Sequence, residues 1–98
     1  MKLNEIINAK GQYSEIDKWI PLSIEKAAQL ISKEIPHAMS TKKKYVKFAQ
    51  DEIDLSTFNQ MNTNLFHDLI QSLGYTLAYS NIRRPWSSVN IPVITISW

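Results

Sequence analysis

The spacing of apolar residues changes at Gly74, and this change limits the folds open to the chain. Before Gly74, apolar residues recur every three or four positions, which is typical of helices. After it, Tyr75, Leu77 and Tyr79 alternate with smaller or polar residues, and residues 93–98 alternate again and are rich in β-branched side chains. These two stretches flank a polar segment interrupted by proline, so they predict an antiparallel β-hairpin.

The fold class that follows is α+β, with three to five helices followed by a C-terminal antiparallel β-hairpin. A hairpin alone is only marginally stable in water. It must therefore lie on the helices, find a third strand or pair with a partner, and the sequence leaves these alternatives open. The chain has 98 residues, of which 44% are hydrophobic, and this suits a single small domain over residues 1–98.

The apolar spacing in the first third of the chain predicts three helices. The first ends near Gly11, and the second begins at Ser14 and ends at Pro21. The third is the most regular, with Ser23 as its N-cap and Pro36 as its end.

The segment from Thr41 to Ile53 fits two structures. As a helix, it places its apolar side chains on one face, whereas as a strand it contains the suitable residues Tyr45, Val46 and Phe48. Three lysines in a first helical turn would oppose the helix dipole. We therefore favour a helix that begins after the lysines.

The segment that follows predicts a helix capped by Asp54 and ended by Gly74, because its apolar residues recur at helical spacing. Several weak helix formers lie near Asn62. The pattern therefore fits either one imperfect helix or two helices with a break near Asn62.

The composition limits the compartment and the chemistry. The chain has no cysteine, which excludes a disulfide framework, a thiolate zinc site and a cysteine nucleophile. No apolar run approaches the ~18–20 residues of a membrane-spanning helix, and the N-terminus lacks the apolar stretch of a signal peptide. We expect a soluble, cytoplasmic protein that has no membrane partner.

The chain lacks the residue combinations that catalysis requires. Its only histidines are His37 and His67, and His67 and its neighbour Asp68 would point about 100° apart on a helix. Two isolated glycines cannot form a glycine-rich phosphate loop. We therefore expect no enzyme activity, no catalytic residue, no cofactor and no metal site.

The net charge of +2 conceals an uneven distribution of charge. Residues 35–50 and residues 69–98 contain basic residues and no acidic ones. The first segment contains a lysine cluster, which consists of Lys42, Lys43, Lys44, Lys47 and the interleaved Tyr45. Lysines with an interleaved aromatic residue suit the phosphates of nucleic acid, and they equally suit an acidic protein surface. The segregated charges predict one electropositive, partner-binding face.

The polar segment of the predicted hairpin contains Arg83, Arg84, Pro85 and Trp86. Arginine and tryptophan are enriched among the residues that contribute most to binding, and proline limits the freedom that a loop loses on binding. We predict that Arg83, Arg84 and Trp86 bind a partner. The other interpretation places Trp86 in the core.

The hairpin carries a surplus of large apolar side chains, namely Tyr75, Tyr79, Trp86, Ile94, Ile96 and Trp98. The helices can cover only one face of a two-stranded sheet. Either these side chains pack in the core, or the second face pairs with a partner. A homodimer formed through the hairpin is one such pairing.

Two stretches of the chain resemble the helix-turn-helix domains of phage repressors. They are residues 48–61 and residues 68–77, the second of which contains the motif Leu-Gly-Tyr-x-Leu. The resemblance implies DNA binding by a recognition helix that begins at Ser56–Asn59. The family's turn glycine is absent, since Glu52-Ile53-Asp54 occupies its place.

The sequence predicts a small, non-enzymatic binding protein that occludes or regulates a larger protein or protein–nucleic-acid complex. Such a chain would be an inhibitor, an immunity or anti-defence factor, or an adaptor, as found in phages and mobile elements. The alternative is a nucleic-acid-binding regulator that uses the lysine cluster and the hairpin arginines. A third interpretation is a subunit of a larger assembly.

Overall fold

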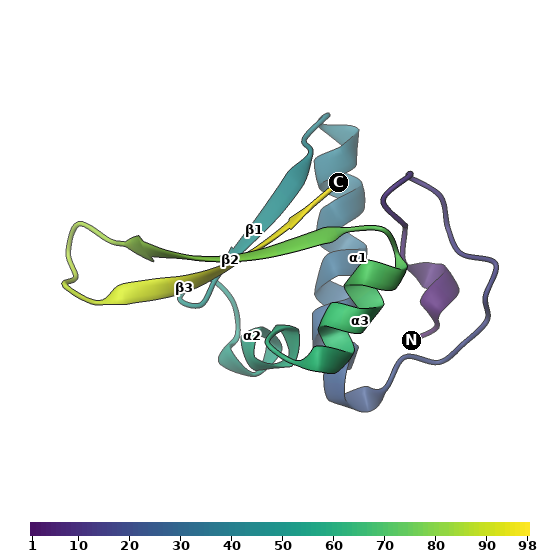
Figure 1. The fold of residues 1–98 in the computed structure, drawn as a ribbon, viewed down its shortest axis with the longest axis horizontal. Coiled ribbons are helices and arrows are strands. Elements are labelled where there is room, and N and C mark those ends of the chain that lie inside the picture. The colour runs from purple at the N-terminus through teal and green to yellow at the C-terminus, as the bar shows by residue number, and fades with distance from the viewer.

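The computed structural model describes all 98 residues as three α-helices and a three-stranded sheet (Figure 1). Two short 3-10 turns precede the first helix. In chain order the elements are η1 (Leu3–Glu5), η2 (Leu22–Ile24), α1 (Glu25–Ser40), β1 (Tyr45–Ala49), α2 (Leu55–Met61), α3 (Asn64–Ser72), β2 (Thr76–Arg83) and β3 (Asn90–Ser97). The α+β class is confirmed, but strand β1 lies between helices rather than after them.

The last strand lies in the middle of the sheet. The strand order is β1-β3-β2, and β3 is antiparallel to both of its neighbours. One face of the sheet carries Phe48, Ile94 and Ile96, which are buried with side chains of the helices in a single core. On the other face, positions such as Thr76, Ala78 and Ser80 are exposed. Because alternate residues point to opposite faces, most of the hairpin's apolar surplus enters the core.

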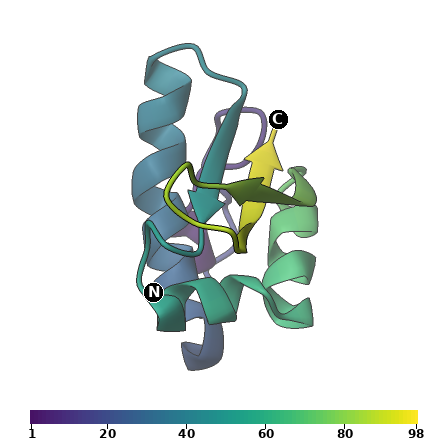
Figure 2. The ribbon, with the colours of Figure 1, turned by 90° about the vertical axis from the view of Figure 1, so that its left-hand side faces the viewer.

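Figure 2 looks onto the tip of the β2–β3 hairpin, with α1 on one side, α3 on the other and α2 across the bottom. Helix α1 contacts β1 and α2, and α3 contacts β2. The hairpin is longer than the rest of the sheet, since β1 ends opposite Val93 and the β2–β3 pairing continues to Arg83 and Asn90. The hairpin end therefore projects from the body (Figure 1).

Helix α1 begins later and ends later than the sequence predicted. Ser23 lies in the turn η2, and the helix begins at Glu25, where the side chain of Gln60 accepts a hydrogen bond from Ala27 N–H at 3.1 Å. Pro36, predicted as the end, lies inside the helix. Ile35, directly before the proline, and Ala38, two positions after it, are buried, and their burial offsets the lost backbone hydrogen bond.

Helix α1 ends in a tight turn at Lys42. Lys42 N–H bonds to Met39 O at 3.0 Å and Lys43 N–H to Ala38 O at 2.9 Å, the two hydrogen bonds of a Schellman motif. Lys42 has a φ of 64°, in the left-handed region where glycine is the usual residue. A lysine at this position strains the backbone.

We expect Lys42→Gly to raise the free energy of unfolding by about 1 kcal/mol, because glycine adopts the left-handed conformation without a Cβ clash. Urea unfolding followed by circular dichroism measures the change. Lys43→Gly is the matched control, since Lys43 has no positive φ. Its replacement should not raise the stability, and an equal gain in both variants would contradict the explanation.

Residues 45–49 form strand β1, so the helix favoured for this segment is wrong. Tyr45 and Val46 pair with Ser97 and Ile96 across the sheet. A five-residue strand has too little periodicity to be distinguished from a helix by sequence. The third strand that the hairpin needed is supplied by this segment.

The helical region after Asp54 is two helices, as one of the two alternatives predicted. Asp54 caps α2 by accepting a hydrogen bond from Thr57 N–H at 3.3 Å, and Thr63 caps α3 in the same way through Phe66 N–H at 3.3 Å. Only Asn62 and Thr63 separate the helices. Gly74 has a φ of 86° and follows the end of α3, as predicted.

The first 24 residues contain no α-helix, which corrects the two short helices predicted there. They form an extended segment held by pairs of backbone hydrogen bonds, including Leu3 N–H to Lys18 O at 2.7 Å and Ile20 N–H to Met1 O at 2.9 Å. Ile6 is fully buried in the core, and the Tyr75 hydroxyl donates to Ile7 O at 2.6 Å. The segment therefore packs as a layer beside α1 and α3.

Candidate functional site

The projecting end of the hairpin exposes large apolar side chains. Trp86 is 80% exposed and Val89 is 66% exposed, and Arg83 is also exposed. The prediction that Trp86 is a surface residue is thus consistent with its position. A tryptophan this exposed contributes little to folding and is available to a partner.

Arg84, which the sequence predicted to bind a partner, forms hydrogen bonds within the protein. Its guanidinium donates to Asp51 through Nε at 3.0 Å and Nη2 at 2.9 Å, and also to the Glu52 carboxylate. These bonds join the hairpin to the loop that follows β1. The Asp51 and Glu52 hydrogen bonds raise the pKa of Arg84, and the Arg84 hydrogen bond lowers the pKa of Asp51.

The pKa of Asp54 is also lowered, by hydrogen bonds from the Ser56 hydroxyl and the Thr57 N–H. A carboxylate with a lowered pKa in the folded state contributes stability above its unfolded pKa, which is about 3.9. This stability is lost as the pH falls through the lower, folded pKa. We expect the free energy of unfolding to decline below about pH 4.

Asp51→Asn should reduce that decline, because one of the two responsible carboxylates is removed. Urea unfolding at several pH values between about 2.5 and 6 measures the slope. Glu15→Gln is the control, since Glu15 is exposed and forms no hydrogen bond or ion pair. An unchanged slope in Asp51→Asn would contradict the assignment.

The lysine cluster lies at the opposite end of the sheet. Lys42, Lys43 and Lys44 form the turn between α1 and β1, and the Lys47 Nζ lies 5.4 Å from the centre of the Tyr45 ring. None of these lysines pairs with a carboxylate. Their charges are therefore free to interact with an external anion.

The two basic groups lie at opposite ends of the sheet, so an electropositive face that included both would extend along its length. Tyr45 pairs with Ser97 at one end of β3, whereas Arg83 pairs with Asn90 at the other end. At about 3.3 Å per residue, this register separates the two ends by roughly 23 Å. A partner that contacts Arg83 and the lysine cluster together would have to span the length of the sheet.

Helix α3 presents a polar stripe that sequence reasoning missed. The stripe, which we call the α3 stripe, consists of Asn64, His67, Asp68 and Gln71, at the spacing i, i+3, i+4 and i+7 of one helix face. Asn64, Asp68 and Gln71 are exposed. His67 is half-buried and hydrogen-bonds the hydroxyl of Tyr79 on β2. The spacing of the four residues is present in the sequence, but the weak helix propensity of Asn64 favoured a break in the helix rather than a continuous helix face.

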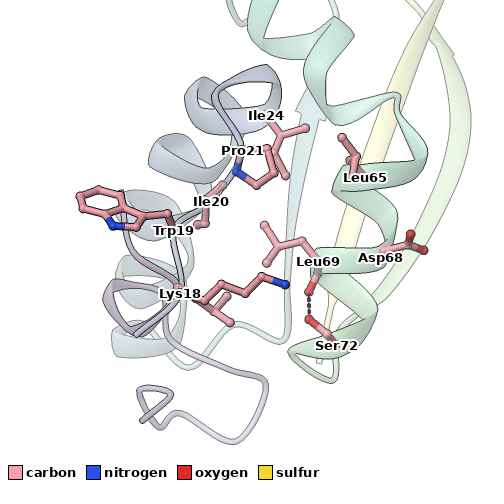
Figure 3. A pocket seen from close by; sticks show the side chains of 10 residues that line it. Lys18, Trp19, Ile20, Pro21, Ile24, Leu65, Asp68, Leu69 and Ser72 are labelled. Carbon is pink, nitrogen blue, oxygen red and sulfur yellow. Dashed lines mark hydrogen bonds between the residues drawn. The ribbon is translucent and has the colours of Figure 1, made fainter. Parts of the chain in front are cut away.

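An apolar cleft of about 300 Å³ takes up one flank of α3 (Figure 3). Pro21 and Ile24 line one side of the cleft, and Leu65 and Leu69 line the other. Asp68 also lines the cleft, although in Figure 3 its carboxylate points away from it. Asn64 and Gln71 of the α3 stripe lie outside the cleft, whereas Asp68 lies at its edge.

The α2–α3 pair corrects the details of the helix-turn-helix resemblance. Residues 48–53 form the end of β1 and a turn, so α2 has no helix before it in the expected position. Ser56–Asn59 does lie in a helix, α2, and α3 is the second helix of the pair. The tail of the resemblance, from Asp68 to Leu77, does coincide with the end of α3 and the start of β2.

No group of three or more histidine, aspartate or glutamate side chains lies close enough together to hold a metal ion. No helix is long and apolar enough to cross a membrane. Compared with models of protein families, with characterised proteins and with solved structures, the chain finds no significant match.

Proposed function

We propose that this domain binds duplex DNA as a winged helix-turn-helix module. Its elements follow the order helix, strand, helix, helix, strand, strand, and the last strand lies in the middle of the sheet. This order is typical of winged helix-turn-helix domains. In the helix-turn-helix mode of binding, the second helix of the pair enters the major groove.

The α3 stripe is the observation that carries the proposal. Asparagine and glutamine side chains form paired hydrogen bonds with adenine, and aspartate accepts from the amino group of cytosine. An ordinary solvated helix face is rich in lysine and glutamate, whereas α3 has Asp68 as its only charged residue apart from the titratable His67. The composition of the stripe thus suits base edges better than it suits bulk water.

Two exposed cations are candidates for phosphate contacts in such a complex. Arg83 lies on the projecting hairpin, and Lys26 lies beside the start of α2, where its Nζ is 3.0 Å from the Ser56 hydroxyl. In the proposed complex, these two cations contact phosphates while α3 occupies the groove. The lysine cluster lies at the far end of the sheet and has no part in this interface.

The salt dependence of binding tests the proposal. With two phosphate contacts, the slope of log K against log salt concentration should be about −2 for duplex DNA. Fluorescence anisotropy with labelled duplexes measures it, after a binding sequence has been enriched from a random pool. Arg83→Gln should reduce the slope by about one. Lys43→Gln, the control at the far end, should leave it unchanged. Failure to enrich any sequence, or equal effects of both variants, would overturn the proposal.

A protein partner is a second candidate, which the exposed hairpin end favours. Trp86 and Val89 form an apolar tip beside Arg83. Exposed tryptophan and arginine side chains of this kind often insert into a pocket of a partner protein. In this interpretation the chain acts stoichiometrically by occluding a surface of its partner. The two candidate functions predict different effects of substitutions. Trp86→Ala should weaken binding to a protein partner, whereas substitutions in the α3 stripe should weaken binding to DNA.

We expect Trp86→Ala to leave the melting temperature nearly unchanged, because Trp86 is 80% exposed. Trp98→Ala is the matched control. Trp98 is half-buried and its ring lies edge-on to Tyr75, with ring centres 5.9 Å apart, so its loss should lower the melting temperature clearly. Differential scanning calorimetry compares the two. A similar drop in both would mean that Trp86 is part of the core.

A further inference from the structure

A hollow of about 460 Å³ at the end of the sheet opposite the hairpin gathers basic side chains from two parts of the chain. We call it the lysine hollow. Its lining includes Lys10, Lys42, Lys43 and Lys44, together with the apolar side chains of Met39 and Trp98. No acidic side chain lines it. Its volume lies in the range of small-molecule sites, which is about 300–1,000 Å³.

The four lysines of the lysine hollow have no partner within the protein. None forms an ion pair with a carboxylate, and all four are exposed. Lysines at the end of α1 are favourable for the helix dipole. That effect does not account for Lys10, which reaches the same hollow from the N-terminal segment.

The position of Lys10 is set by hydrogen bonds of its neighbours. The Asn8 side chain accepts from Lys10 N–H at 2.9 Å, and Ala9 N–H donates to Leu73 O at 2.9 Å. A Cβ at Gly74 would lie 3.3 Å from the Cβ of Ala9, so the two segments approach closely. Lys10 lines the same hollow as Lys42, Lys43 and Lys44, and an anion bound there would relieve the repulsion among these like charges.

The positive charge of Lys42 is present at a position where a lysine strains the backbone. Its φ of 64° makes glycine the better residue for stability, yet the chain has a lysine there. Local strain of this kind is typical of binding sites.

Trp98 supplies an aromatic wall next to the lysines. The backbone N–H of Trp98 donates a hydrogen bond to the backbone carbonyl of Lys44 at 2.9 Å, which fixes Trp98 beside the lysine turn. Tyr75 meets the Trp98 ring edge-on, at an interplanar angle of 78°. Lysines beside an aromatic ring are the combination that binds the phosphates and the stacked base of a nucleotide.

We propose that the lysine hollow binds the phosphate groups of a nucleotide, with the base against Trp98. The chemistry is common to a free nucleotide and to the phosphorylated end of a nucleic-acid strand. This site is separate from the α3 stripe, so nucleotide binding here does not depend on DNA binding by the stripe.

Tryptophan fluorescence can follow binding at the lysine hollow. Trp19 and Trp86 are 67% and 80% exposed, so the double variant Trp19→Phe/Trp86→Phe leaves Trp98 as the only tryptophan with little effect on the fold. We expect ATP to quench this fluorescence saturably at low salt. Tripolyphosphate should compete with ATP for the site, and adenosine without phosphate should not bind measurably. The absence of saturation with ATP would overturn the proposal.

Matched lysine variants distinguish a specific ATP site from general electrostatic attraction between ATP and the basic protein. In the single-tryptophan background, Lys43→Gln/Lys44→Gln should weaken ATP binding at least about tenfold. Lys18→Gln/Lys33→Gln removes the same charge from exposed positions that do not line the hollow, and it should have little effect. Lys42→Gly should weaken ATP binding while raising the melting temperature. Equal weakening by both double variants would show non-specific attraction and overturn the proposal.

Oligonucleotides distinguish the two sources of phosphate. A short single strand with a 5′-phosphate that binds more tightly than ATP, and more tightly than the same strand without the phosphate, supports a strand end. ATP binding as tight as that of the strand supports a free nucleotide. In either case, Asn64→Ala/Gln71→Ala should leave binding at the lysine hollow intact.

Discussion

Phe66→Ala is expected to lower the free energy of unfolding by about 3–5 kcal/mol, the typical cost of removing a large aromatic side chain from a core. Phe66 lies on the inward face of α3 and is fully buried in the core cluster with Ile70, Ile94 and Ile96. Domains of this size have a total stability of about 5–15 kcal/mol. Much of the stability would therefore be lost, and urea unfolding followed by circular dichroism measures it.

Leu65→Ala is the control on the same helix. Leu65 is 51% exposed at the rim of the apolar cleft, so its replacement should cost much less than that of Phe66. If Phe66→Ala costs under about 1 kcal/mol, the orientation of α3 is wrong. The outward position of the α3 stripe would then be wrong as well, since both follow from the same helix rotation.

Asn64→Ala/Gln71→Ala is expected to lower the affinity for the enriched duplex at least about 30-fold. Each side chain that reads a base edge contributes about 1–3 kcal/mol of discrimination, and about 1.4 kcal/mol corresponds to a factor of ten. Affinity for unrelated duplexes should change little, because phosphate contacts provide most of the non-specific binding. Anisotropy titrations with both duplexes at one salt concentration measure this ratio.

The matched control replaces two other exposed amides, Gln12 and Gln29, with alanine. Gln12 lies in the N-terminal segment and Gln29 on α1, so neither lies on α3. This control should retain full affinity. Loss of affinity for both duplexes alike in Asn64→Ala/Gln71→Ala would show that the stripe does not read bases. The melting temperature of each variant excludes unfolding as the cause.

Local sequence signals correctly predicted the parts of the structure that depend on residues only a few positions apart. The change of period at Gly74 predicted the hairpin, Asp54 predicted the start of α2, and the weak helix formers near Asn62 predicted the break. Caps and turns act over three or four residues, so their signals survive in any tertiary context. The N-terminal segment was misread because its hydrogen-bonding partners lie up to 68 positions away in the chain.

The candidate sites were predictable as residue types and not as surfaces. The sequence singled out Arg83, Arg84 and Trp86 as one group, but Arg84 turns toward Asp51, which lies 33 positions away. Lys10 joins Lys42 in one hollow across a similar separation in the chain. A side chain's partner across the fold cannot be read from its neighbours in sequence, because packing decides which groups meet.

The sequence by itself determined the α+β class, the positions of α2, α3 and the hairpin, and the chemistry available for binding. These properties follow from hydrophobic period, capping residues and composition, all of which are local. Only the tertiary structure decided that residues 45–49 are a strand, that the basic groups lie at opposite ends of the sheet, and that α3 presents its polar stripe outward. Each of these depends on burial against distant segments, and the free energy of that burial outweighs local propensity.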